Sequence, residues 1–111
     1  MASLLSCGGG GSGVDRGKAL GLLTPAEKMQ VCDDVNRAQG GYGRMVKCSD
    51  GHTEHTDSDQ ASCQTAAPMS GQPCGNLTVG ALLDCVHAIG TDLCAFATAP
   101  ACQPERDCIG T

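Results

Sequence analysis

The clearest hydrophobic period in the chain lies between residues 78 and 90. Thr78 is a residue type that caps helices, and the apolar positions after it recur at the three- and four-residue spacing of one helical face: Val79, Leu82, Leu83, Val86 and Ile89. Gly90 belongs to the residue type that most often follows a helix C-terminus. We therefore predict an amphipathic helix that ends at Ile89.

A capping box predicts a second helix near the start of the chain. Thr24 can cap it, Pro25 suits the first helical position, and Glu27 can reach back to the cap. Apolar residues then recur every third position, at Ala26, Met29, Cys32 and Val35. Gly40 and Gly41 end the pattern, so the helix is expected over residues 25–39.

The remaining elements are predicted to be short and separated by loops. The expected elements are an extended piece over 44–48, a helix over 57–65 opened by a capping box from Asp57 to Gln60, a fourth helix after Thr91 or Asp92, and one turn over 105–108. The fold class is therefore mostly α: a small disulfide-rich bundle of three to four short helices with long loops. We assign it to residues 22–111.

The chain holds nine cysteines in 111 residues, which is typical of a disulfide scaffold in an oxidising compartment. Zinc ligands usually stand two to four residues apart, whereas the closest pair here, Cys102 and Cys108, has five residues between. If Cys7 is set aside, an even number remains. About four bridges are expected among Cys32, Cys48, Cys63, Cys74, Cys85, Cys94, Cys102 and Cys108, with the pairing left open.

The composition explains why bridges are needed and excludes several classes of protein. One Tyr, one Phe and no Trp leave a core without the large ring areas that dominate most interiors. No apolar run is long enough to span a bilayer as a helix. A net charge of −5 and few aromatic residues argue against nucleic-acid binding.

The N-terminal segment carries a possible lipidation signal. Leu4-Leu5-Ser6-Cys7, followed by a Gly/Ser run over 8–13, resembles a lipobox and tether, and the layout is similar to small cysteine-rich bacterial lipoproteins of myxobacterial type. The resemblance implies a lipid on Cys7 and anchoring in the bacterial cell envelope, on the periplasmic or outer surface. Because only six residues precede Cys7, residues 1–21 are interpreted as a truncated signal followed by a flexible tether.

One loop concentrates metal-ligating side chains, namely Asp50, His52, Glu54 and His55. Imidazole and carboxylate at this density could bind a divalent ion such as Zn²⁺. The simpler interpretation is an exposed acidic loop, because an H-x-x-H pair without further zinc motif residues is weakly specific.

No catalytic residues are predicted. The chain lacks a nucleophile elbow, His87 falls on the polar side of its helix, and the neighbouring Asp33 and Asp34 are expected on a solvated face. Tyr42 is a possible contact residue, although helix packing is the favoured role. We predict a monomeric, non-catalytic envelope lipoprotein with a binding or structural role, no cofactor, no deep pocket and no nucleic-acid partner. The alternatives are a metal-binding protein that uses the His52/His55 loop and a redox protein with free thiols of low pKa.

Overall fold

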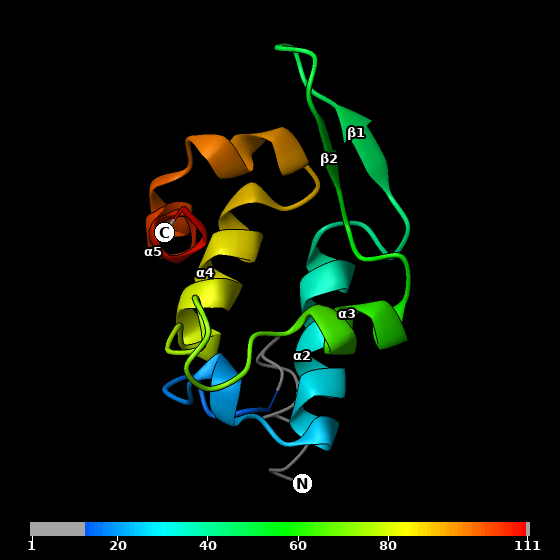
Figure 1. Cartoon of the computed structure of the whole chain (residues 1–111). Coiled ribbons are helices and arrows are strands. Elements are labelled where there is room, and N and C mark those ends of the chain that lie inside the picture. The colour runs from blue at the N-terminus through cyan, green and yellow to red at the C-terminus, as the bar shows by residue number, and fades with distance from the viewer. Residues whose placement is uncertain (1–12, 111) are drawn as a thin grey trace, which may run out of the picture.

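The computed structural model describes residues 13–110, and it confirms the predicted mostly helical, disulfide-rich fold. Two longer helices, α2 and α4, lie side by side and run in the same direction, and the shorter elements surround them (Figure 1). In chain order, with η denoting a 3₁₀ helix, the elements are η1 (Leu20–Leu22), α2 (Pro25–Ala38), β1 (Met45–Lys47), β2 (Thr53–His55), α3 (Gln60–Ala66), α4 (Val79–Ile89), η2 (Leu93–Ala97), η3 (Pro100–Cys102) and α5 (Gln103–Ile109).

The caps of α2 and α4 are those the sequence predicts. The Glu27 amide donates to Thr24 Oγ1 over 3.2 Å, and the Glu27 carboxylate accepts from the Thr24 amide over 2.9 Å, which completes the capping box. At α4, the Ala81 amide donates to Thr78 Oγ1 over 3.1 Å, and Gly90 ends the helix with φ +54°. Local chemistry therefore sets both ends of α4 and the start of α2.

The buried face of α2 differs from the predicted stripe. Ala26 is exposed and Met29 keeps 44% of its surface in solvent, whereas Val31 is buried. A strict three-residue repeat advances 300° per step, so it turns by about 60° each time and carries Ala26 to the side opposite Val35. The main core instead joins α2 to the apolar face of α4 through Leu20, Leu23, Val31, Val79, Leu83 and Val86.

The folded domain includes residues that the sequence analysis assigned to the tether. The Leu20 amide donates to the Leu77 carbonyl over 2.8 Å, and the Val79 amide donates to the Lys18 carbonyl over 2.9 Å. At Gly21 an added Cβ would lie 2.7 Å from the backbone nitrogen of Ser70, so only glycine allows the two segments to approach this closely. The predicted boundary at residue 22 was therefore wrong, because Val14 and Leu20 already pack against the core.

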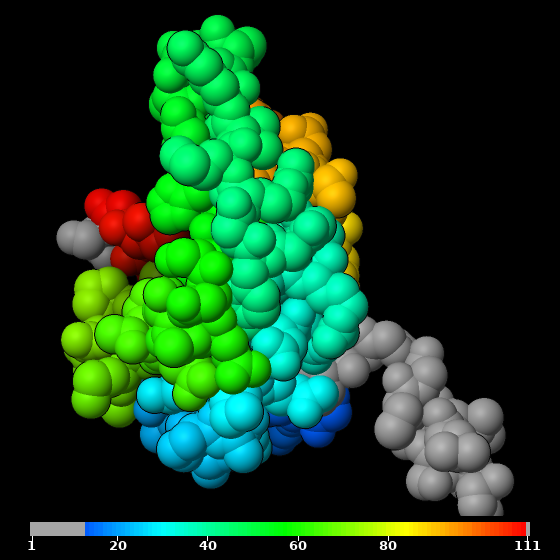
Figure 2. All heavy atoms as spheres, turned by 90° about the vertical axis from the view of Figure 1, so that its right-hand side faces the viewer, coloured from blue at the N-terminus to red at the C-terminus, as the bar shows by residue number. Residues whose placement is uncertain are grey.

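A β-hairpin projects from one end of the helical body (Figures 1 and 2). Strand β1 falls within the predicted extended piece, but β2 was not predicted, and it pairs antiparallel with β1 in the register Val46 opposite Glu54. The next helix begins later than expected, because Asp59 rather than Asp57 accepts from the Ser62 amide over 2.8 Å. The carboxylate of Asp57 instead accepts from the side-chain amide of the fully buried Asn36 over 3.0 Å.

Four disulfides join different parts of the fold, as the placement of the cysteines predicted. They pair Cys32 with Cys63, Cys48 with Cys94, Cys74 with Cys108, and Cys85 with Cys102. Cys32, Cys48, Cys85 and Cys102 are buried, so sulfur occupies core positions that rings fill in other proteins. Four bridges indicate an oxidising compartment, extracellular or periplasmic. Within residues 13–110, no helix is long and apolar enough to cross a bilayer.

Candidate ligand-binding cavity

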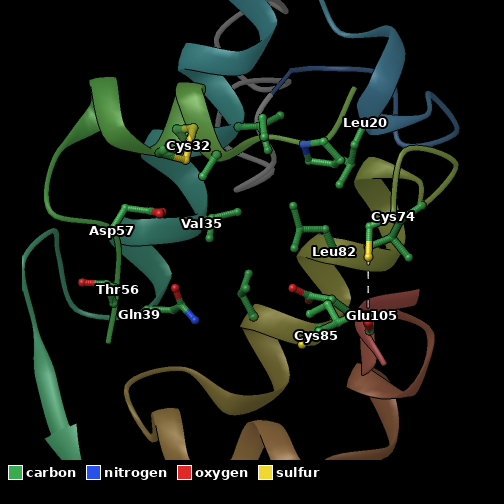
Figure 3. Close-up of a pocket in the computed structure, with 18 of the residues that line it drawn as sticks. Leu20, Cys32, Val35, Gln39, Thr56, Asp57, Cys74, Leu82, Cys85 and Glu105 are labelled. Carbon is green, nitrogen blue, oxygen red and sulfur yellow. Dashed lines mark hydrogen bonds between the residues drawn. A yellow bond between two sulfur atoms is a disulfide. The ribbon is translucent and has the colours of Figure 1, made fainter. Parts of the chain in front are cut away.

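A half-open cavity of about 490 Å³ lies between α2 and α4 (Figure 3). Val35 lines it from α2 and Leu82 lines it from α4, while Ala66, Ala67, Pro68 and Pro73 contribute from α3 and the loop that follows. Most of the lining is apolar, and the volume falls in the range of small-molecule sites. No cavity of this kind was predicted from the sequence.

The cavity follows from the small side chains on the facing helices. The main core packs α4 against α2 and the N-terminal segment, and a second buried cluster packs the far end of α4 against η2 and η3 through Cys85, Ile89 and Cys102. Val35 and Leu82 pack against the main core but are themselves only partly buried. Among the described residues that line the cavity, Phe96 is the only one with a benzene ring. The aliphatic side chains around it leave the space open.

Polar side chains of the lining lie on both walls. Gln39, which ends α2, and Thr56 and Asp57, which follow β2, lie across the cavity from Glu105 of α5 (Figure 3). The Thr56 hydroxyl already has two hydrogen-bond partners: it donates to the Gly41 carbonyl over 2.8 Å and accepts from the Arg44 amide over 2.9 Å. Asp57 is held by Asn36, as described above.

Glu105 is the exception among these polar groups. Its Oε1 is enclosed by protein and, within residues 13–110, has no hydrogen-bond partner. Burial raises the pKa of this carboxyl above its usual range. The Glu105 side chain lines the cavity, and an apolar cavity with one carboxyl group in its wall has the ordinary composition of a small-molecule site (Figure 3).

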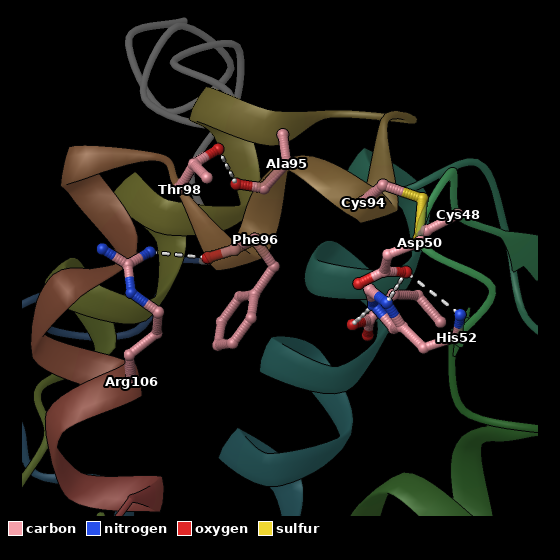
Figure 4. Close-up of polar contacts among 9 residues, drawn as sticks. Cys48, Asp50, His52, Cys94, Ala95, Phe96, Thr98 and Arg106 are labelled. Carbon is pink, nitrogen blue, oxygen red and sulfur yellow. Dashed lines mark hydrogen bonds and ion pairs between the residues drawn. A yellow bond between two sulfur atoms is a disulfide. The ribbon is translucent and has the colours of Figure 1, made fainter.

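Helix α5 is fixed in place by contacts on both sides of Glu105. Cys102 just before the helix bonds to Cys85 of α4, and Cys108 bonds to Cys74 of the loop before α4. Arg106 donates to the Phe96 carbonyl over 2.5 Å (Figure 4). It also donates to the Ala99 carbonyl over 2.8 Å. The sequence analysis predicted a turn here but not a functional carboxyl. The available signal was two acidic residues, Glu105 and Asp107, between two cysteines of the predicted scaffold.

The predicted metal-binding residues do not form a ligand set. At the hairpin, His52 interacts with Asp50 through Nδ1 (Figure 4). Its Nε2 interacts with Glu54 over 2.8 Å. Hydrogen bonds to Asp50 and then to Glu54 raise the pKa of His52, which favours the imidazolium, and an imidazolium binds no metal. His55, three residues on, falls on the opposite face of the strand and contacts the Thr56 carbonyl. In the described part of the chain, no group of three or more His, Cys, Asp or Glu side chains could hold a metal ion.

Three further residues were singled out from the sequence: Tyr42, Asp34 and His87. Tyr42 is partly buried and donates to Asp33 Oδ1 over 2.7 Å, and this burial and bond raise the pKa of the phenol. This position fits the favoured prediction for Tyr42, that it packs against a helix, here α2. Asp34 was predicted to be solvated, but only 8% of it is exposed, because α2 turns this side chain toward the protein, where it pairs with Arg37 over 2.7 Å. His87 is exposed, as predicted.

Comparison with known proteins adds no family assignment. No protein-family model, curated protein or solved structure matches this chain. The predicted lipidation site Cys7 and the lipobox-like residues before it lie outside the described residues.

Proposed function

We propose that this chain is a non-catalytic binding domain of the bacterial cell envelope that takes a small, largely apolar molecule into the cavity between α2 and α4. The observation that carries the proposal is the cavity itself: about 490 Å³ in volume and mainly apolar in lining. Both cysteines of the Cys32–Cys63 disulfide line it, and so does Cys74, which is bonded to Cys108. A wall that is crosslinked before the ligand arrives loses little conformational entropy on binding.

The anchoring part of the proposal depends on the N-terminal motif. A lipid on Cys7, placed by the Leu4–Cys7 lipobox, would hold the domain at the membrane, and the bridges suit an oxidising compartment outside the cytoplasm. We expect the protein from membranes of its native host to carry acyl mass on Cys7, and Cys7→Ser to leave the membrane fraction. An unmodified intact mass in the membrane fraction, or unchanged membrane association of the variant, would contradict anchoring by this residue.

The binding part is tested with the neutral apolar dye Nile red and two matched variants. Leu82→Trp fills the cavity from α4, whereas Met45→Trp adds the same ring to β1, where Met45 is 75% exposed and lines no part of this cavity. We expect wild type and Met45→Trp to bind the dye with the blue-shifted emission of an apolar environment, and Leu82→Trp to lose this binding. Failure of wild type to bind, or equal binding by Leu82→Trp, would refute the cavity as the site.

A further inference from the structure

Glu105 is placed in the cavity wall by covalent and hydrogen-bonded contacts on both sides of it. Disulfides at Cys102 and Cys108 bracket it, and Arg106 ties the helix to two backbone carbonyls. Even so, its Oε1 is enclosed without a partner in the described part of the chain. A carboxyl group with so few hydrogen bonds is costly to bury, and because Glu105 lines the cavity, a ligand there that donates to the carboxyl group would offset part of that cost.

The other acidic groups of the lining already have partners. Asp57 accepts from Asn36, and Glu54 is paired with His52 over 2.8 Å. Lys28 is the only permanently cationic side chain that lines the cavity, against three carboxyl groups, and the whole chain carries a net charge of −5. Electrostatic complementarity therefore favours a cationic ligand over an anionic one.

From this arrangement, and on the basis of the proposed binding function, we propose that the cavity selects an amphipathic amine. Its apolar body would lie between Val35 and Leu82, and its protonated nitrogen would donate to Glu105. A charge-assisted hydrogen bond of this kind is about twice as strong as a neutral one. Two related ligand classes are disfavoured: a neutral alcohol would gain the weaker bond, and a fatty acid would bring a second carboxyl group to Glu105.

The test compares three ligands that share one chain and differ in the head group. n-Decylamine, 1-decanol and decanoate are titrated below their micelle concentrations at pH 7, and displacement of bound Nile red is measured. We expect decylamine to bind most tightly and decanoate least. Glu105→Gln, which keeps the shape and removes the charge, should weaken decylamine binding by about tenfold or more and leave decanol unchanged. Lys28→Gln is the matched charge control on the same cavity and should leave the preference for decylamine intact.

The outcomes separate this inference from the proposed function. If Nile red binds and decanol displaces it, but decylamine has no advantage or Glu105→Gln does not reduce one, the cavity is a binding site and the amine inference is wrong. Tighter binding of decanoate that is lost in Lys28→Gln would also overturn it, in favour of an anionic ligand. If neither the dye nor any of the three compounds binds, the proposed function fails and the inference fails with it. Formation of all four disulfides in Glu105→Gln, checked by mass, excludes misfolding as the cause of lost binding.

Discussion

The contribution of the disulfides is tested most sharply by the bridge between Cys48 and Cys94. It joins the end of β1 to η2 and closes the longest loop of the four, with a sequence separation of 46 residues. In the chain-entropy model the removal of this link increases the entropy of the unfolded chain enough to cost about 4 kcal/mol of stability at 25 °C, compared with about 3 kcal/mol for the 17-residue separation of Cys85 and Cys102. Since small domains are stable by about 5–15 kcal/mol, this is a large loss.

The variant that removes this bridge is Cys48→Ala/Cys94→Ala, and urea unfolding followed by circular dichroism is the assay. We expect its free energy of unfolding to fall by about 4 kcal/mol. Met45→Ala is the matched control on the same hairpin; because Met45 is 75% exposed, we expect its effect to stay within about 0.5 kcal/mol. A loss of less than about 1 kcal/mol in the double variant would refute the reasoning, because it would mean that the hairpin does not unfold together with the rest of the domain.

Three further predictions concern buried and titrating groups. Asn36→Ala should lower the free energy of unfolding by about 2–3 kcal/mol, because fully buried Asn36 binds both the amide and the carboxylate of Asp57; a loss below about 0.5 kcal/mol in urea unfolding would contradict this. Burial raises the pKa of Glu105, so without ligand the wild type should lose stability relative to Glu105→Gln as pH rises from 4.5 through the folded-state pKa; melting temperatures whose difference does not change with pH would count against it. Hydrogen bonds to Asp50 and then to Glu54 raise the pKa of His52, and hydrogen bonds from the amide and then the ring of His52 lower the pKa of Asp50. The stabilising effect of His52 is therefore present in acid and is lost as pH rises through the folded-state pKa of His52. Thermal melts should show the largest advantage of wild type over His52→Gln between the ordinary pKa values of 3.8 and 6.5, and a larger advantage at pH 9 would show the assignment to be wrong.

The elements that the sequence predicted well are those determined by neighbouring residues. Thr24 with Glu27 and Thr78 with Gly90 mark helix ends through bonds that span at most a few residues. The strand β2 was missed because its hydrogen-bond partners lie in β1, and nothing in Thr53–His55 alone distinguishes a strand from a loop. Choosing between Asp57 and Asp59 as the cap of α3 likewise required knowledge of Asn36, which lies 21 residues before Asp57 and binds it.

The candidate site depends still more on distant contacts. The sequence predicted that the cysteines pair, but several residues of the cavity wall, such as Val35 and Leu82, read as ordinary core positions in the helical pattern. They line an open space because other residues, those of the main core, join α2 to α4. The disulfides could therefore be predicted from the sequence, whereas the cavity between α2 and α4 could not.

The cavity wall, the position of Glu105 and the oxidising compartment all depend on one pattern of covalent links. The most direct test is peptide mapping of the unreduced protein by mass spectrometry, after alkylation of free thiols and digestion with trypsin and thermolysin. We predict four crosslinked pairs, Cys32–Cys63, Cys48–Cys94, Cys74–Cys108 and Cys85–Cys102, and no alkylation at any of these eight positions. Alkylated sulfur at Cys102 or Cys108, or a different partner for either, would contradict the account, because Glu105 would then no longer be held in the wall of the cavity.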